Sequence, residues 1–247
     1  MTREFVWMIR HIKRSFKYKK WLSSMKDWYR FWTSYYTYNK LAVAKTDCLS
    51  IRDLQPCLGD DTAETAIEPV YFYQDTWAFE QIIKVSPARH IDVGSHHKFV
   101  AFLSKVLPVL MIDIRPLSLP LETLEFKKGS ILNLPFPDKS IASLSSLCVA
   151  EHIGLGRYGD SLDPLGSEKA IAELCRVISH NGNLYISVPI DNNNRIFFNA
   201  QRAFKEEYLE GLLSPLKIID RKYIYKNSLL NNKPDEFSIG LYHAVRE

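Results

Sequence analysis

The sequence lacks an apolar run long enough to cross a membrane. The longest uninterrupted run, from Val106 to Ile112, has seven residues, whereas a membrane-spanning helix needs roughly 20. It also lacks the apolar region of a signal peptide, because basic residues interrupt the N-terminal segment repeatedly. We therefore expect a cytoplasmic protein. Peripheral attachment to the inner face of the cell membrane is a second expectation, which depends on the N-terminal segment.

Cysteines are few and widely spaced. The chain has four, at Cys48, Cys57, Cys148 and Cys175. None forms a CxxC pair, so the spacing indicates neither a disulfide framework nor a zinc site, and we expect buried, reduced thiols. The adjacent His96 and His97 are a poor chelate, because neighbouring positions at a helix start point about 100 degrees apart. No metal is predicted.

The basic excess of the chain is confined to its first 40 residues. That segment holds ten Lys or Arg and two acids, while the remaining residues hold 22 basic and 26 acidic side chains. It also contains 12 of the 31 aromatic residues and four of the five tryptophans, including Trp28 and Trp32. Aromatic residues recur at helical spacing among the basic ones, so we predict an amphipathic helical extension over residues 1–45.

The composition of this extension is compatible with three kinds of binding partner. A basic, aromatic helix is suited to an anionic membrane surface, which we expect first for residues 1–40. The aromatic stripe could instead pack on the protein's own main domain or on a second subunit, in a homodimer. Nucleic acid is the least favoured partner, because no recognised binding module surrounds the segment, and we expect none.

From residue 71 onward, helical and strand patterns alternate, which predicts a parallel sheet covered on both faces. A last pair of strands without an intervening helix predicts an antiparallel edge hairpin. Ser167 is a plausible N-cap for one helix, and Asn181-Gly182 a left-handed stop for it. The expected helices span 76–85, 97–107, 167–179 and 197–213, and the expected strands span 90–93, 109–114, 126–131, 141–147, 183–188, 216–225 and 237–245.

Glycine is scarce in the loop that follows the first expected strand. Asp92 and Gly94 stand where a dinucleotide-binding loop would begin, but His96 and Phe99 occupy the positions of its later glycines. A pyrophosphate needs close backbone approach at these positions. The loop therefore favours a ligand without phosphate, S-adenosylmethionine. Asp113, 21 residues after Asp92, is placed to bind its ribose, although a strand-end turn residue would look the same.

The stretch from Gly129 to Ile153 resembles class I methyltransferases. It contains the residues LPFPD (134–138) and, after a strand, EHI (151–153). In that family an adenine-contacting loop, this turn and a fourth strand follow one another. The resemblance implies a Rossmann-like class I methyltransferase fold over residues 46–247, an α/β fold with a mostly parallel seven-stranded sheet and an antiparallel edge hairpin.

Three further motifs resemble a narrower family. They are YFYQDTW (71–77), EHIGLGRYGD (151–160) and FNAQR (198–202). They look like uncharacterised methyltransferase-like proteins found in bacterial surface-polysaccharide gene clusters and elsewhere. That family carries no substrate assignment. Its resemblance to this chain covers roughly residues 70–245.

The resemblance implies a cofactor site with S-adenosylmethionine as the cofactor. Ser130 stands where many class I enzymes have an acid facing the adenine amine, and His96 replaces a common second glycine. The implied cofactor residues are Asp92, Gly94, Ser95, Asp113, Ser130, Ile131 and Leu132.

The expected reaction is transfer of a methyl group to a hydroxyl of a sugar. His152 follows the fourth strand and is our first candidate for the general base, since histidine titrates near neutral pH; its alternative role is to hold the loop through Glu151 or the backbone. Arg157 and Asp160 lie in a glycine-bounded loop that could grip the acceptor. The remaining candidates for acceptor binding are Tyr158, Asp191, Asn199 and Arg202.

Two rival functions remain open at this point. The leading hypothesis is an O-methyltransferase that acts on a sugar of a surface polysaccharide or its precursor. A methyltransferase for another small-molecule or lipid acceptor is the first alternative. The second is a non-catalytic, membrane-associated scaffold with a degenerate methyltransferase fold.

Overall fold

The computed structural model of the chain describes residues 18–41, 51, 54–115 and 117–247. The chain divides into two compact units, Met1–Ala66 and Ile67–Glu247. Residues 46–66, which we had grouped with the main domain, fall into the N-terminal unit by this division. The two units are described separately below.

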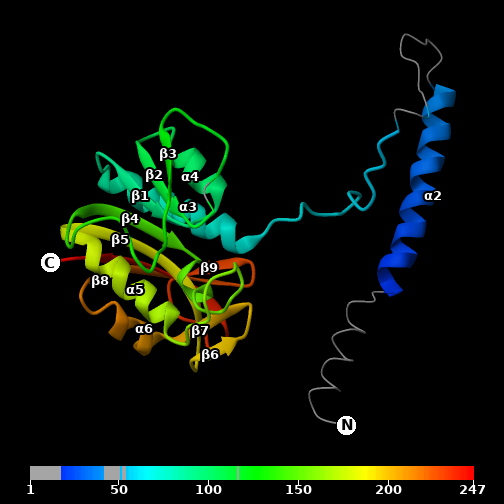
Figure 1. The fold of residues 1–247 in the computed structure, drawn as a ribbon. Helices are drawn as coiled ribbons and strands as arrows, with labels where there is room; N and C mark the ends of the chain where they lie inside the picture. The colour runs from blue at the N-terminus through cyan, green and yellow to red at the C-terminus, as the bar shows by residue number, and fades with distance from the viewer. Residues whose placement is uncertain (1–17, 42–50, 52–53, 116) are drawn as a thin grey trace. The chain divides into compact units, whose positions relative to one another are not determined.

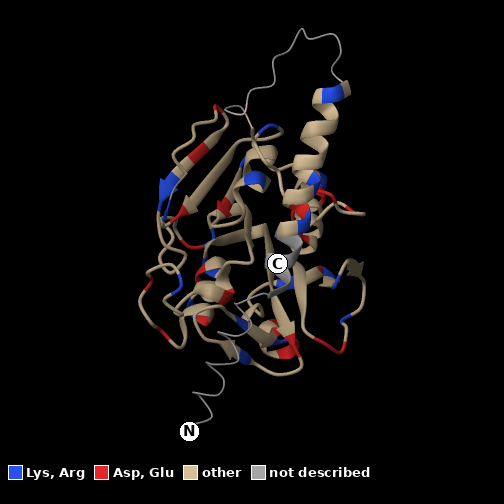
Figure 2. Cartoon of the chain, turned by 90° about the vertical axis from the view of Figure 1, so that its right-hand side faces the viewer, with Lys and Arg blue, Asp and Glu red and all other residues tan. Residues whose placement is uncertain are grey.

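The N-terminal unit contains one long helix, α2 (Tyr18–Leu41). Its aromatic side chains contact one another, with the rings of Trp28 and Trp32 stacked at 6.5 Å between centroids. Both rings are more than a third exposed, and Tyr29 is 73% exposed. Figure 2 shows basic residues along the same helix. The predicted helix is thus present over residues 18–41, whereas Trp7 and the rest of 1–17 lie outside the described residues.

None of the helices in the described part of the chain has the length and apolarity that crossing a membrane requires.

The main unit is built on a ten-stranded sheet (Figure 1). Five parallel strands in the order β3-β2-β1-β4-β5 form its core, and β10 lies antiparallel between β5 and β8. The mixed sheet confirms the predicted fold class, although the number of strands exceeds the predicted seven. The strands of this path are β1 (His90–Val93), β2 (Val109–Asp113), β3 (Leu124–Lys128), β4 (Ile141–Leu147), β5 (Ile178–Asp191), β8 (Lys217–Tyr225), β9 (Ser228–Leu230) and β10 (Ser238–Val245).

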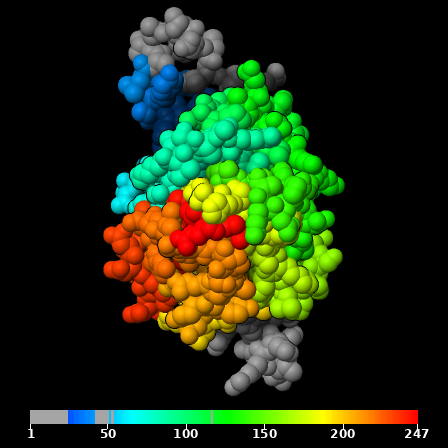
Figure 3. Space-filling model, turned by 90° about the vertical axis from the view of Figure 1, so that its left-hand side faces the viewer, coloured from blue at the N-terminus to red at the C-terminus, as the bar shows by residue number. Residues whose placement is uncertain are grey.

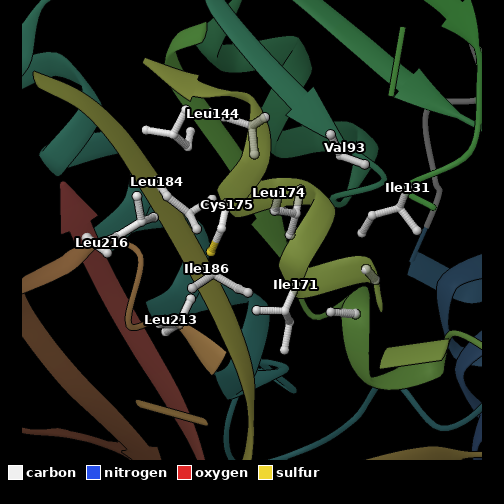
Figure 4. Packing of buried hydrophobic residues seen from close by; sticks show 14 of the residues in the cluster. Val93, Ile131, Leu144, Ile171, Leu174, Cys175, Leu184, Ile186, Leu213 and Leu216 are labelled. Carbon is white, nitrogen blue, oxygen red and sulfur yellow. The ribbon is translucent and has the colours of Figure 1, made fainter. Parts of the chain in front are cut away.

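Helices cover both faces of the sheet (Figure 1). The helices α3 (Pro69–Val85) and α4 (His97–Leu103) pack on one face, and α5 (Gly166–Val177) and α6 (Glu206–Leu212) pack on the other. Alternate residues of each strand enter opposite cores, as period-two side-chain alternation requires. In β5, for example, Leu184 and Ile186 pack toward α5 in Figure 4, whereas Tyr185 belongs to the core beneath α3.

The helix α3 begins where local chemistry stabilises a helix start. The Glu68 carboxylate accepts a hydrogen bond from the Tyr71 backbone N–H at 2.7 Å, and Pro69 occupies the first turn. Proline is favoured there because its missing N–H has no helical partner anyway. The helix therefore begins at Pro69, seven residues before the predicted start at residue 76. It places Tyr71 near the loop after β1, where the rings of Tyr71 and His96 lie 4.7 Å apart.

One predicted helix is wrong. Residues 197–213 form a short hairpin, β6 (Arg195–Phe197) with β7 (Gln201–Lys205), and only then α6. Asn199 adopts a left-handed conformation (φ 59°) between the two strands. The strand pairing buries Ala203 and Phe204 completely, while a helix would require a continuous apolar stripe that the exposed Phe197 and Phe198 do not provide.

The predicted bounds of the preceding helix, 167–179, are also corrected. The helix α5 begins at Gly166, with Leu165 rather than Ser167 as its N-cap, and ends at Val177. Asn181 does take a left-handed conformation (φ 57°), but it does so inside β5. Its backbone N–H donates to the Arg246 carbonyl at 2.8 Å. In Figure 3 the C-terminal residues (red) lie beside the surface formed by the segment of α6 and β8 (orange).

The cysteines are only partly as expected. Cys175 is buried and Cys148 half-buried, but Cys57 is exposed; all three are free thiols. Cys48 lies outside the described residues.

Candidate active site

The site is built on the loop after β1. This strand lies between β2 and β4, where the order of the parallel strands reverses, and ligands of such sheets bind beyond the carboxyl ends of the strands at that point. The Asp92 carboxylate accepts hydrogen bonds from the Ser95 N–H (3.0 Å) and from the Ser145 hydroxyl (2.6 Å). Asp92 is completely buried, so it holds the loop in place from inside rather than lining a cavity.

A polar chain between β1 and β4 supports Asp92. Because the Ser145 hydroxyl donates to Asp92, its oxygen is left to accept from Nε2 of His90 at 2.8 Å, and Nδ1 accepts from Ser143 at 2.7 Å. Burial lowers the pKa of His90 to about 3, so its ring stays neutral in this arrangement. Burial also raises the pKa of Asp92 to about 6, against the opposing effect of Ser145 and Ser95. His90 and Asp92 therefore hold the loop after β1 in place.

Gly94 brings the loop close to the end of β2. It has φ +72°, and a Cβ built on it would lie 3.1 Å from Val149 and 3.8 Å from the Asp113 carboxylate. A side chain here would be strained and would point toward Asp113. One oxygen of Asp113 accepts from the Arg115 N–H at 2.6 Å. The Asp113 carboxylate at the end of β2 thus faces the space above Gly94, and its hydrogen bond from Arg115 holds it in place.

Two adjoining cavities of about 120 Å³ and 610 Å³ open at this point. They share the lining residues Gly94, Asp113, Arg115, Cys148, His152 and Tyr158. Both extend over the carboxyl ends of the central strands. Together they are of the size of a small-molecule or cofactor site, which is roughly 300–1,000 Å³.

The smaller cavity brings together most of the predicted cofactor residues. It is lined by Gly94, Asp113, Ser130, Ile131 and Leu132, and Ser95 lines the larger cavity. Asp92 lines neither. The Ser130 hydroxyl accepts from the Leu132 N–H at 3.2 Å, so it also fixes the turn that the adenine side of the site would need.

Asp160 organises the loop of residues 154–160. Its carboxylate accepts hydrogen bonds from the N–H groups of Gly154 (2.7 Å), Gly156 (3.4 Å) and Tyr158 (3.2 Å). Partial burial acts to raise the pKa of Asp160, but these backbone donors outweigh it and lower the pKa. The carboxylate is therefore committed to shaping the loop, which places Tyr158 over both cavities.

His152 lines both cavities and both of its ring nitrogens have polar neighbours. Its Nδ1 lies 2.7 Å from the Ala200 carbonyl oxygen and donates to it, since a carbonyl can only accept. Nε2 then carries the lone pair in the neutral ring. Burial lowers the pKa of His152; the bond to Ala200 opposes this, and the charge of Arg157 reinforces it. A neutral imidazole can accept a proton at Nε2, and Arg157 Nη1 lies 3.4 Å from that nitrogen.

Arg157 is tied to the same carbonyl. Its guanidinium donates to the Ala200 oxygen at 3.1 Å, and Nη1 lies 3.2 Å from Nδ1 of His152. It also lies over the Tyr158 ring, 5.1 Å from its centroid, while Arg115 approaches the same ring to 4.4 Å. Two guanidinium groups therefore gather beside Tyr158 at the larger cavity.

Three residues predicted to bind the acceptor lie away from both cavities. Asp191, at the end of β5, contacts the Arg195 guanidinium at 3.3 Å. Asn199 occupies the turn between β6 and β7. Arg202 is buried and its guanidinium pairs with Glu168 and the Pro164 carbonyl. None of the three lines either cavity.

The larger cavity includes residues that sequence reasoning missed. Tyr71 belongs to a motif that had been singled out, but no role was assigned to it, and Gln201 likewise sits within a noted motif. Glu151 was considered only as a partner of His152. The missed lining residues include Glu68, Tyr71, His96, Arg115, Cys148, Glu151, Gln201 and Phe237.

Comparison with known proteins gives a family match over part of the chain. Residues 126–227 match a family described as Caenorhabditis protein of unknown function, DUF268. The match includes β4, His152 and the loop of residues 154–160. The description contains no activity and no reference to polysaccharide. No curated protein matches the chain.

Solved structures show a more extensive similarity, of fold. A Galdieria sulphuraria protein provisionally assigned as a sarcosine dimethylglycine methyltransferase has a TM-score of 0.54 at 14% identity, over 71% of this chain and 86% of that one. The [4+2]-cyclase SpnF has a TM-score of 0.52 at 11% identity, over 70% and 81%. The N-methyltransferase NodS of Bradyrhizobium japonicum WM9 has 0.51 at 13%, over 72% and 97%.

These identities are low, and the named activities of the three proteins differ, so the similarity indicates no substrate. A fold by itself does not fix a reaction. Taken with the strand order and the antiparallel β10, the comparisons establish that the main unit has the class I methyltransferase fold.

Proposed function

We propose that this protein is an S-adenosylmethionine-dependent O-methyltransferase whose acceptor is a sugar, as part of a surface glycan or its precursor. The observation that carries the proposal is the position of Asp113. Its carboxylate stands at the end of β2, faces Gly94 and lines both cavities. A carboxylate there can accept from the two hydroxyls of a ribose.

The remaining cofactor residues fit an adenosyl ligand. Gly94 leaves open the space that a Cβ would fill beside Asp113. Apolar Ile131 and the turn at Ser130 and Leu132 border the smaller cavity, as a flat base requires. The bound cofactor would supply an electrophilic methyl group on sulfur.

His152 would receive the proton of the acceptor hydroxyl. Nε2 carries the lone pair, because Nδ1 donates to Ala200, and Arg157 Nη1, 3.4 Å from Nε2, would yield this position to the acceptor. A positioned general base contributes typically 10²–10⁴-fold to rate. The base form requires a neutral ring, and the pKa of His152 is lowered from 6.5. Activity should therefore persist through neutral pH and decline only as the pH falls below 6.5.

The acceptor side favours a substrate that carries negative charge. Arg115 and Arg157 lie beside Tyr158 on the larger cavity, and guanidinium groups bind phosphate and carboxylate with paired donors. A sugar linked to a nucleotide or lipid through phosphate combines that charge with the hydroxyl that His152 would deprotonate. This is our reason for preferring a glycan precursor over a neutral acceptor.

The exposed aromatic face of α2 supports membrane association. Rings of Trp28 and Trp32 suit the boundary between lipid headgroups and acyl chains, and nearby basic residues are attracted to anionic lipid. We propose that the N-terminal helix holds the enzyme at the membrane face where lipid-linked precursors are found.

The test is a turnover assay with a panel of nucleotide-linked and free sugars, in which S-adenosylhomocysteine formation is measured at saturating donor. The wild-type protein should turn over at least one acceptor. His152→Ala should lose about 10²–10⁴-fold in rate and keep its affinity for the donor. His180→Ala, an exposed histidine at the opposite end of β5, is the matched control and should be unaffected. Failure of the wild-type protein to bind S-adenosylmethionine in calorimetry would contradict the proposal.

A further inference from the structure

Glu151 is a buried acid at the wall of the larger cavity. It follows β4 in the short helical turn Ala150–His152 and is 1% exposed. It lines the 610 Å³ cavity together with Tyr71, Ser95 and Arg157. It takes no part in the proton transfer proposed for His152.

One of its two carboxyl oxygens has no partner. Oε1 lies 3.7 Å from Nε2 of His152, beyond hydrogen-bond distance, and Oε2 is buried without any hydrogen bond among the described residues. A buried carboxylate without a partner is unfavourable, since neither water nor a counter-charge compensates it. The environment therefore favours the protonated form of this group, or a ligand that supplies positive charge.

Three titratable or charged side chains act on Glu151 or lie beside it: Cys148 after β4, His152 on its own turn, and Arg157 on the loop of residues 154–160. Asp75 on α3 acts on Cys148. The other titratable residues that line the same cavity are Glu68, Tyr71, His96, His97, Asp113, Arg115 and Tyr158. Burial raises the pKa of Glu151 to about 8, while its own backbone, Cys148 and the charge of Arg157 act against that rise. His152 carries no charge at neutral pH, because its pKa is lowered from 6.5.

We propose that Glu151 is the group that recognises the positively charged methionine half of the methyl donor, and that it gives up its proton when that ligand binds. The proposal rests on the proposed function. In the binding step the O–H bond of the acid breaks, the proton passes to the buffer, and the carboxylate is left facing the cationic ligand group. An opposite charge within about 4–6 Å favours the ionised form of an acid.

Two cationic groups of the donor could be the partner, the sulfonium and the α-ammonium. Three ligands separate them. S-adenosylmethionine carries both groups, S-adenosylhomocysteine carries only the ammonium, and 5′-methylthioadenosine carries neither while keeping the adenosine.

The experiment is isothermal titration of the full chain with each ligand at pH 7, in phosphate and in Tris, whose ionisation enthalpies differ. From a free-state pKa of about 8, binding of S-adenosylmethionine should release ~0.9 proton at this pH. Release with S-adenosylhomocysteine as well assigns the ammonium, and release with S-adenosylmethionine alone assigns the sulfonium. Methylthioadenosine should release none.

Two variants control the source of the proton. Glu151→Gln keeps the shape of the side chain and should abolish the release, whereas Asp75→Asn removes a second acid of raised pKa, about 6, and should leave it intact. Release that persists in Glu151→Gln, or its absence from the wild-type protein despite tight binding, would overturn the inference and leave the methyltransferase proposal standing. Absence of wild-type binding would remove both.

The wild-type protein also provides a test that needs no variant. If binding requires loss of the Glu151 proton, the dissociation constant for S-adenosylmethionine should decrease by about tenfold between pH 6 and pH 7. A dissociation constant that is flat over this interval would overturn the inference even if Glu151→Gln failed to fold.

Discussion

The substitution Asp113→Asn tests the cofactor site most directly. Asparagine keeps one carbonyl oxygen to accept from the Arg115 N–H, a bond of 2.6 Å in the native loop, so the turn after β2 should survive. The second oxygen becomes an amide donor, and the negative charge is lost. A ribose hydroxyl that had donated to this position would lose its acceptor.

The expected loss of affinity follows from the free energy that such a hydrogen bond contributes. A hydrogen bond to a charged group contributes about 1.5–3 kcal/mol, which corresponds to about a 10- to 150-fold change in dissociation constant. Isothermal titration with S-adenosylmethionine and S-adenosylhomocysteine measures this change. Both ligands should lose affinity to the same extent, because they share the ribose.

Asp191→Asn is the matched control. Asp191 also ends a parallel strand, but it contacts Arg195 and lines neither cavity. Its substitution should leave the dissociation constant unchanged, with thermal unfolding used to verify that both variants are folded. Native affinity in Asp113→Asn would refute the ribose assignment, and an equal loss in both variants would show that the effect is not specific to the site.

Two further predictions concern the Arg202–Glu168 ion pair and the N-terminal helix. Arg202→Met removes the guanidinium from the half-buried Glu168 and leaves it the Tyr208 hydroxyl, and losing a hydrogen bond to a charged group costs about 1.5–3 kcal/mol. Urea unfolding should show that loss, and a smaller loss in Arg202→Met/Glu168→Leu, whereas equal losses would contradict pairing. Trp28→Ser with Trp32→Ser should reduce flotation with anionic liposomes while leaving donor affinity unchanged, and undiminished flotation would count against membrane binding by α2.

The parallel core was predictable because its signals are local. The strands at 90–93 and 141–147 were predicted with the bounds that the structure gives, since each is a short segment that follows turn residues, Pro87 in one case and Asp138-Lys139-Ser140 in the other. Gly94 and Asp113 followed from the same logic, because the carboxyl ends of adjacent parallel strands meet at one edge of the sheet.

What could not be predicted depends on contacts between distant segments. Ser145 bonds to Asp92 only because β4 pairs with β1, and nothing near Ser145 in sequence indicates it. Arg202 was placed on the rim of the site because a helix was expected there. Its position on β7 directs it to Glu168 instead. Asn181 resembles a helix stop until the Arg246 carbonyl, 65 residues later, is seen to accept its N–H.

The insertion of β10 between β5 and β8 has a consequence for biosynthesis. During translation β5 is made well before residues 238–245, and its outer edge then carries unsatisfied N–H and C=O groups next to an apolar face. Exposed edges of this kind are templates for pairing with other chains. The nascent polypeptide is therefore most prone to misassociation in the interval between the synthesis of β5 and that of β10, and the late strand acts as the closing element that ends this period.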